Sequence, residues 1–124
     1  MPVYQDIEEN FKRGVIDMII LKLLSQGDMY AYQMASVITE QSGGKIEVKL
    51  GTVYGPLYRM INRGYISEYK ELVGKRRTRV YYHIEPAGLE YLNMSVEIYC
   101  NINYAVQKMI TDKSKRQDDE QGVF

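Results

Sequence analysis

The chain has 124 residues with 16 acidic and 16 basic side chains, and this length suits one domain. The neutral balance excludes a protein that coats nucleic acid through a large net positive charge. The single cysteine, Cys100, excludes an internal disulfide. The acidic start and the short, interrupted apolar run at 15–24 exclude a signal peptide and a membrane span, so we expect a soluble cytoplasmic protein.

The first half of the chain predicts two helices. Residues 1–10 show no clear period and are expected to form a lead-in or a short helical turn. Residues 11–25 are densely apolar and predict a largely buried helix. Asp28 is expected to cap a second helix, which ends near 43–44 at two glycines. Apolar and charged side chains alternate over 45–50, which favours a short strand that pairs with a later hairpin.

A third helix is predicted over residues 51–63. Pro56 cannot donate to the carbonyl of Thr52, so we expect an irregular helix start. The apolar positions share one face: Val53, Leu57, Met60, Ile61 and Gly64. The opposite face carries small, polar and basic residues: Thr52, Gly55, Tyr58, Arg59, Asn62 and Arg63.

The pattern then changes to strands and back to a helix. Residues 65–73 and 78–85 are rich in Tyr, Val and Ile and flank a basic hairpin tip at 74–77. Pro86 suits the first turn of a final helix over 86–110, with Glu85 as a weak cap. Mostly apolar residues recur along this helix at alternating spacings of three and four, which is typical of a dimer seam. They are Leu89, Leu92, Val96, Tyr99, Val106 and Ile110, with the polar Asn103 at one seam position. Residues 111–124 are polar and are expected to form a disordered tail.

The order of these elements predicts a mainly α fold with a small β-hairpin, a winged helix-turn-helix over 11–85 followed by a dimerisation helix. In such proteins the later helix of the pair enters the major groove of DNA. Residues 45–79 hold nine basic and three acidic side chains, a balance of +6 that the rest of the chain cancels. A basic face of this kind favours a polyanionic partner, whereas the alternative is a solvated surface with its charges pointing in several directions.

Several stretches within residues 14–92 resemble the PadR family of phenolic-acid-responsive repressors. They are Gly27-Asp28-Met29-Tyr30-Ala31-Tyr32, Leu50-Gly51-Thr52-Val53-Tyr54, Leu57-Tyr58-Arg59, Arg63-Gly64-Tyr65-Ile66, Gly74-Lys75-Arg76-Arg77 and Tyr81-Tyr82-His83-Ile84. The resemblance implies a repressor that leaves its operator when a small planar or phenolic molecule binds. The single final helix resembles the shorter subfamily, in which that helix makes the homodimer. A two-fold dimer implies double-stranded DNA with an inverted-repeat operator.

The resemblance also assigns residues. It implies that Tyr54 contacts DNA and that Tyr30 or Tyr32 lies near a phosphate. The other expected DNA contacts come from the third helix, its approach and the hairpin tip: Lys49, Thr52, Tyr58, Arg59, Arg63, Lys75, Arg76 and Arg77. By comparison with multidrug-sensing relatives, an effector would bind beside three residues, which are Met18, Tyr99 and Asn103. The alternative is that Tyr99 and Asn103 only pack and set the register of the seam.

Two other function classes are an enzyme and a protein-interaction module. The only histidine, His83, lies on a predicted strand, and the sequence has no paired carboxylates and no metal or nucleotide motif, so we expect neither an enzyme nor a cofactor. A winged-helix module that binds proteins instead of DNA is the second alternative. The basic hairpin together with Arg59 and Arg63 favours DNA, because an interaction module would not need them.

Overall fold

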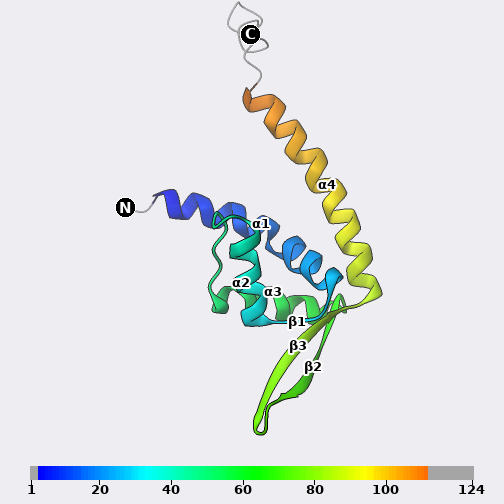
Figure 1. Cartoon of the computed structure of the whole chain (residues 1–124). Coiled ribbons are helices and arrows are strands. Elements are labelled where there is room, and N and C mark those ends of the chain that lie inside the picture. The colour runs from blue at the N-terminus through cyan, green and yellow to red at the C-terminus, as the bar shows by residue number, and fades with distance from the viewer. Residues whose placement is uncertain (1–2, 112–124) are drawn as a thin grey trace, which may run out of the picture. The chain divides into compact units, whose positions relative to one another are not determined.

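The computed structural model describes residues 3–111, so the expected tail lies outside the described residues except for Thr111. Three helices are followed by a hairpin and a last helix, which confirms the winged helix-turn-helix plan (Figure 1). None of the described helices is long and apolar enough to cross a membrane. The elements are α1 (Val3–Gln26), β1 (Met29–Tyr30), α2 (Ala31–Gln41), α3 (Leu50–Asn62), β2 (Ile66–Val73), β3 (Arg77–Ile84) and α4 (Pro86–Thr111).

The core forms where the apolar faces of the first three helices meet the root of the hairpin. Each helix contributes residues at helical spacing, because only one face of an amphipathic helix is buried. Burial of these side chains fixes α3 to α1 and α2. The fully or almost fully buried residues are Ile16, Ile20, Leu21, Leu23, Leu24, Ala31, Met34, Ile38, Val53, Leu57, Met60, Ile66, Tyr82 and Leu92.

The first helix begins at Val3, eight residues earlier than the predicted start at Phe11, so the expected lead-in is helical. The acidic residues of this segment suit a helix N-terminus, where the backbone N–H groups favour negative charge. Lys12 adds ion pairs one turn away, with Nζ 3.5 Å from Glu8 Oε1 and 3.4 Å from Glu9 Oε1. These local contacts support a helix that has no buried face to reveal its period in the sequence.

The third strand of the sheet was predicted in the wrong place. Residues 45–49 form no strand, and the strand that joins the hairpin is β1, where Met29 pairs with Tyr82 and Tyr30 pairs with Tyr81. The segment at 45–49 is instead fixed by Ser42, whose Oγ accepts a hydrogen bond from Ile46 N at 2.9 Å. The sheet order is therefore β1-β3-β2, with all neighbours antiparallel.

The predicted cap of the second helix is also wrong. The residue that precedes α2 is Tyr30, and its side chain makes no capping hydrogen bond. Asp28 instead faces the sheet, where Oδ2 accepts from the Tyr69 hydroxyl at 2.7 Å and Oδ1 lies 2.8 Å from His83 Nδ1. Asp28 thus ties the α1–β1 connection to both strands of the hairpin.

The hairpin extends away from the three helices (Figure 1). Val73 pairs with Arg77, so the connecting turn consists of residues 74–76 and Arg77 already belongs to β3. Gly74 has φ 76°, a left-handed conformation that glycine adopts without strain. The predicted hairpin is confirmed, with a tip one residue shorter than expected.

The start of α4 is built around a close backbone contact. Pro86 is its first residue, as predicted. A Cβ on Gly88 would lie 2.1 Å from the carbonyl oxygen of Tyr65, so only glycine fits there. The backbone N–H of Glu85 donates to the same oxygen at 2.9 Å. The Glu85 carboxylate accepts from Ser67 Oγ, which links the residue before α4 to β2, and its role as a cap stays a prediction.

The chain divides into two compact units within α4, after Asn93. In the first unit Leu92 is 3% exposed and belongs to the core, so it does not lie on a free seam as predicted. In the second unit the apolar residues of the predicted seam are exposed. They are Val96, Tyr99, Val106 and Ile110.

Candidate nucleic-acid interface

Helix α3 presents one buried and one exposed face, as the sequence predicts. Val53, Pro56, Leu57 and Met60 are buried. Pro56 does not interrupt the helix, which runs continuously from Leu50 to Asn62, so the expected irregular start is not observed. A single missing N–H removes one backbone hydrogen bond, and burial of the Pro56 ring in the core offsets this loss. The exposed side chains are Thr52, Tyr54, Tyr58, Arg59, Asn62 and Arg63.

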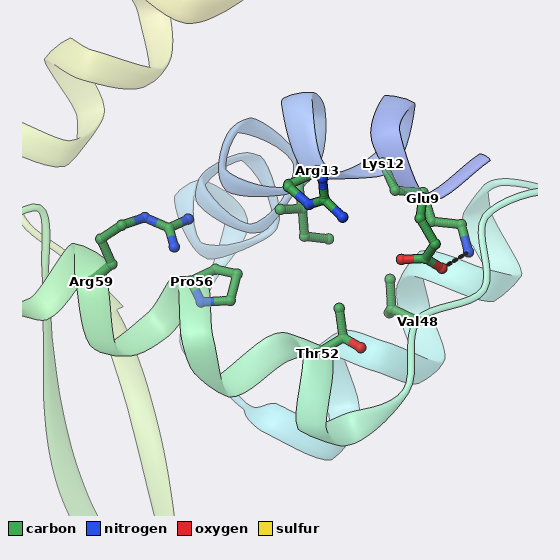
Figure 2. A pocket seen from close by; sticks show the side chains of 8 residues that line it. Glu9, Lys12, Arg13, Val48, Thr52, Pro56 and Arg59 are labelled. Carbon is green, nitrogen blue, oxygen red and sulfur yellow. Dashed lines mark hydrogen bonds and ion pairs between the residues drawn. The ribbon is translucent and has the colours of Figure 1, made fainter. Parts of the chain in front are cut away.

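One flank of α3 faces α1. Thr52, Pro56 and Arg59 line a cavity of about 160 Å³ whose opposite wall is α1, and Figure 2 shows this arrangement. Arg59 Nη2 donates to Asp17 Oδ1 of α1 at 2.6 Å. Arg59 was expected to point toward DNA, but the structure directs its guanidinium to the neighbouring helix.

The other flank of α3 faces the hairpin. Tyr54, Tyr58 and Asn62 line a hollow of about 150 Å³ that Glu68 and Tyr82 close from the sheet side. Tyr58 and Asn62 also reach the centre of the exposed face, because their positions on the helix lie opposite its buried residues. The residues of α3 that remain open to a large partner are therefore Tyr58 and Asn62, with Tyr54 beside them.

The three tyrosines singled out by resemblance lie together. Tyr30, Tyr32 and Tyr54 line one open hollow of about 300 Å³ at the start of α2. The rest of its lining is Ala31 and four residues of β3, which are Thr78, Arg79, Val80 and Tyr82. The Arg79 guanidinium lies 4.3 Å from the centre of the Tyr30 ring, a cation–π contact. The backbone N–H groups at the start of α2 have no side-chain cap, and this helix end favours negative charge.

Arg79 lines this hollow but is not one of the DNA contacts that the sequence predicts. Its position beside Tyr30 depends on the pairing of β1 with β3, and a strand of two residues has no periodicity that a sequence could reveal. The strand pattern does indicate that Arg79 and Tyr81 share one face of β3 and that Tyr82 lies on the other face.

The hairpin tip and the approach to α3 carry exposed cations. Lys75, Arg76 and Arg77 are exposed, as are Lys49 and Arg63. Within residues 3–111 none of these five side chains lies within ion-pair distance of a carboxylate. Their charge is therefore available to a polyanion approaching from solvent.

The base of the hairpin holds a hydrogen-bonded cluster of titratable groups, Asp28, Tyr69 and His83, whose pKa values are shifted. The hydrogen bond to Asp28 raises the pKa of Tyr69 to about 12. The same carboxylate raises the pKa of His83, and the hydrogen bond from Tyr69 lowers the pKa of Asp28. His83 thus braces the sheet, and no group of three or more His, Cys, Asp or Glu within residues 3–111 could hold a metal ion.

The residues expected at an effector site fall in different units of the chain. Met18 is half-buried in the first unit, packed against the core. Tyr99 and Asn103 are exposed in the second unit. Their assembly into one site stays a prediction.

Known proteins share this fold. A transcriptional regulator from Clostridium thermocellum is 30% identical; the match covers 82% of this chain and 96% of that one, with a TM-score of 0.75. A PadR-like transcriptional regulator from Bacillus cereus is 25% identical, with 82% and 97% covered and a TM-score of 0.72. PadR of Bacillus subtilis, solved in complex with operator DNA, is 23% identical, with 66% and 46% covered and a TM-score of 0.62. Residues 20–94, more than half of this chain, match the transcriptional regulator PadR-like family, and the protein therefore belongs to that family.

Proposed function

We propose that this protein is a DNA-binding repressor that reads an operator with α3 and grips the adjacent backbone with the hairpin tip. Two observations carry the proposal together: the tip of the hairpin holds exposed cations without carboxylate partners in the described chain, and α3 is anchored in the core with its other face open. Helix side chains suit base edges in the major groove, and cations suit phosphates. The Bacillus subtilis PadR structure, which holds operator DNA, supports this use of the fold.

The proposal includes a homodimer formed through α4. Val96, Tyr99, Val106 and Ile110 lie at heptad spacing and are between 40% and 70% exposed in the single chain. A second copy would remove this apolar surface from water. A two-fold dimer would then bind an inverted-repeat operator with one copy of α3 in each half-site.

The proposal also includes release of the operator by a small planar molecule. Met18, Tyr99 and Asn103 would form the effector site, because a tyrosine can stack on a flat ligand and methionine adapts to its shape. The alternative is that Tyr99 and Asn103 serve only the packing of the seam. A thermal-shift screen of planar aromatic compounds, with Tyr99→Ala as the variant that abolishes any shift, separates the two.

The test of DNA binding is fluorescence anisotropy with the full chain. The labelled duplexes are the region upstream of the protein's own gene and a scrambled duplex of equal length. We expect tighter binding to the upstream region and a steep loss of affinity as salt rises, because each neutralised phosphate releases counterions. Failure to bind either duplex at low salt would exclude the repressor and favour a protein-interaction module.

The test of the dimer is sedimentation velocity. Val96→Asp places a charge in the seam and is expected to convert dimers to monomers, because an unpaired charge is strongly disfavoured in an apolar interface. Glu97→Gln, one residue along the same helix and outside the seam, is the matched control and should stay dimeric. A Val96→Asp variant that remains dimeric would place the interface elsewhere.

A further inference from the structure

Arg59 differs from the other basic side chains of residues 45–79 because it forms an ion pair with a carboxylate. Its Nη2 lies 2.6 Å from Asp17 Oδ1, and the pair joins α3 to α1. Among the described residues, no other lysine or arginine between positions 45 and 79 lies within ion-pair distance of a carboxylate. A contact between residues 42 positions apart in sequence is a product of the fold, since no helical spacing brings them together.

The contact fixes the direction of the Arg59 side chain. Thr52 and Pro56 occupy the same flank of α3, and both line the cavity beneath α1. Figure 2 shows Arg59 rising from α3 toward α1 on this flank. The guanidinium therefore lies beside the body of the protein, away from the open face that carries Tyr58 and Asn62.

The contact is also reversible. The Arg59 side chain is 43% exposed and that of Asp17 is 25% exposed, so solvent and salt screen the pair. Exposed ion pairs are weak, because water competes with them and two side chains must be held in one geometry. A DNA phosphate that comes close enough can compete with Asp17 for the guanidinium.

We propose that Asp17 is a positioning residue that withdraws Arg59 from the DNA backbone and thereby weakens binding to non-operator DNA. The inference rests on the proposed DNA-binding function. Binding to non-operator DNA comes almost entirely from phosphate neutralisation, so one cation withheld lowers it directly. Base contacts from the open face of α3 are not reduced by the withdrawal, so the sequence preference is kept while the affinity that comes from phosphates is lowered.

The experiment is a double-variant cycle with Asp17→Asn, Arg59→Gln and the two together. Affinity for a scrambled duplex is measured by anisotropy from about 0.05 to 0.3 M salt. Asp17→Asn should raise that affinity roughly fivefold to tenfold at about 0.1 M salt and steepen the salt slope by about 0.9, the value for one added phosphate contact. Arg59→Gln should change affinity less than about twofold, because the wild-type side chain makes no phosphate contact.

The decisive comparison is Asp17→Asn in the Arg59→Gln background. If Asp17 acts through Arg59, the gain disappears there. A gain that persists overturns the proposal, because it shows a general effect of one lost negative charge. A loss of affinity in Asp17→Asn also overturns it, because Asp17 would then direct Arg59 onto DNA.

Two controls separate this inference from the proposed function. Glu9→Gln removes a carboxylate that lines the same cavity but contacts Lys12, so it should leave the affinity within about twofold. Circular-dichroism melting confirms that all variants are folded. If neither the wild type nor any variant binds a duplex, the proposed function fails and the inference fails with it. Wild-type binding combined with an unchanged Asp17→Asn variant refutes the inference alone.

Discussion

The hairpin tip and α3 carry arginines that look equivalent in the sequence but stand in different surroundings. Arg76 and Arg77 are exposed on a projecting hairpin, with no carboxylate at ion-pair distance in the described chain. Arg59 lies on a helix whose other face is buried, and a neighbouring helix holds its guanidinium. The charge counted along a sequence and the charge offered to a partner are therefore separate quantities, because the fold decides which cations it neutralises.

The largest expected difference between α3 and the hairpin tip is in their contributions to the free energy of unfolding. Leu57 lies on the buried face of α3 and is 1% exposed. Leu57→Ala should lower the free energy of unfolding by about 2–5 kcal/mol, because a cavity remains where the side chain was. Urea denaturation measures the change. Arg76→Ala at the hairpin tip is the control and should stay within about 0.5 kcal/mol of the wild type. Equal effects would mean that the tip is part of the folded core.

The next effect is on DNA affinity. Replacing Arg76 and Arg77 together with Ala should weaken binding to operator and scrambled duplexes alike, on the order of tenfold to a hundredfold at low salt. The salt slope should become shallower by about 1.8, the value for two phosphate contacts. Anisotropy titrations over a range of salt measure both quantities.

The matched variant for this experiment is Asn62→Ala on the open face of α3. Asn62 is exposed and uncharged, so its loss should leave the salt slope unchanged and reduce the preference for the operator. If Asn62→Ala weakened both duplexes equally while the tip variant changed sequence preference, the roles assigned to helix and hairpin would be reversed.

The sequence predicted the elements whose pattern is local. The face of α3 that holds Val53, Leu57 and Met60 follows helical spacing, and the hairpin is marked by alternating strands around Gly74. The start of α4 at Pro86 follows from the geometry of proline.

The missed features depend on partners that are distant in sequence. β1 has two residues and exists because β3 pairs with it, so no periodicity announces it. The hydrogen bonds of Asp28 to Tyr69 and His83, and of Asp17 to Arg59, cross 41 to 55 positions. In both cases an acidic residue that the sequence presents as a cap or as a break in an apolar run finds its role only in the folded chain.

The smallest effect concerns the base of the hairpin, where Asp28 meets His83. The contact raises the pKa of His83 above its ordinary value of 6.5, so the stability it adds is present below about that pH and is lost as pH rises through the folded value. The pKa of Asp28 is lowered from 3.8, so its share is present above that value and is lost as pH falls through the folded value. The contact therefore stabilises the hairpin base most between these two ordinary values.

His83→Gln keeps a hydrogen-bonding side chain but cannot titrate. Because the His83 side chain is 51% exposed, the advantage of the wild type should be only a few tenths of a kcal/mol near pH 5.5 and should shrink near pH 8. Urea denaturation of both proteins at the two pH values measures it, and a constant difference would refute the titration. The free tip cations should bind DNA equally in both variants near pH 8, since His83 pairs with Ser67 at the base of the hairpin and the tip begins beyond Val73. A loss of affinity at that pH in His83→Gln would mean that the base of the hairpin positions the tip, and that the tip is less independent of the body than Arg76 and Arg77 suggest.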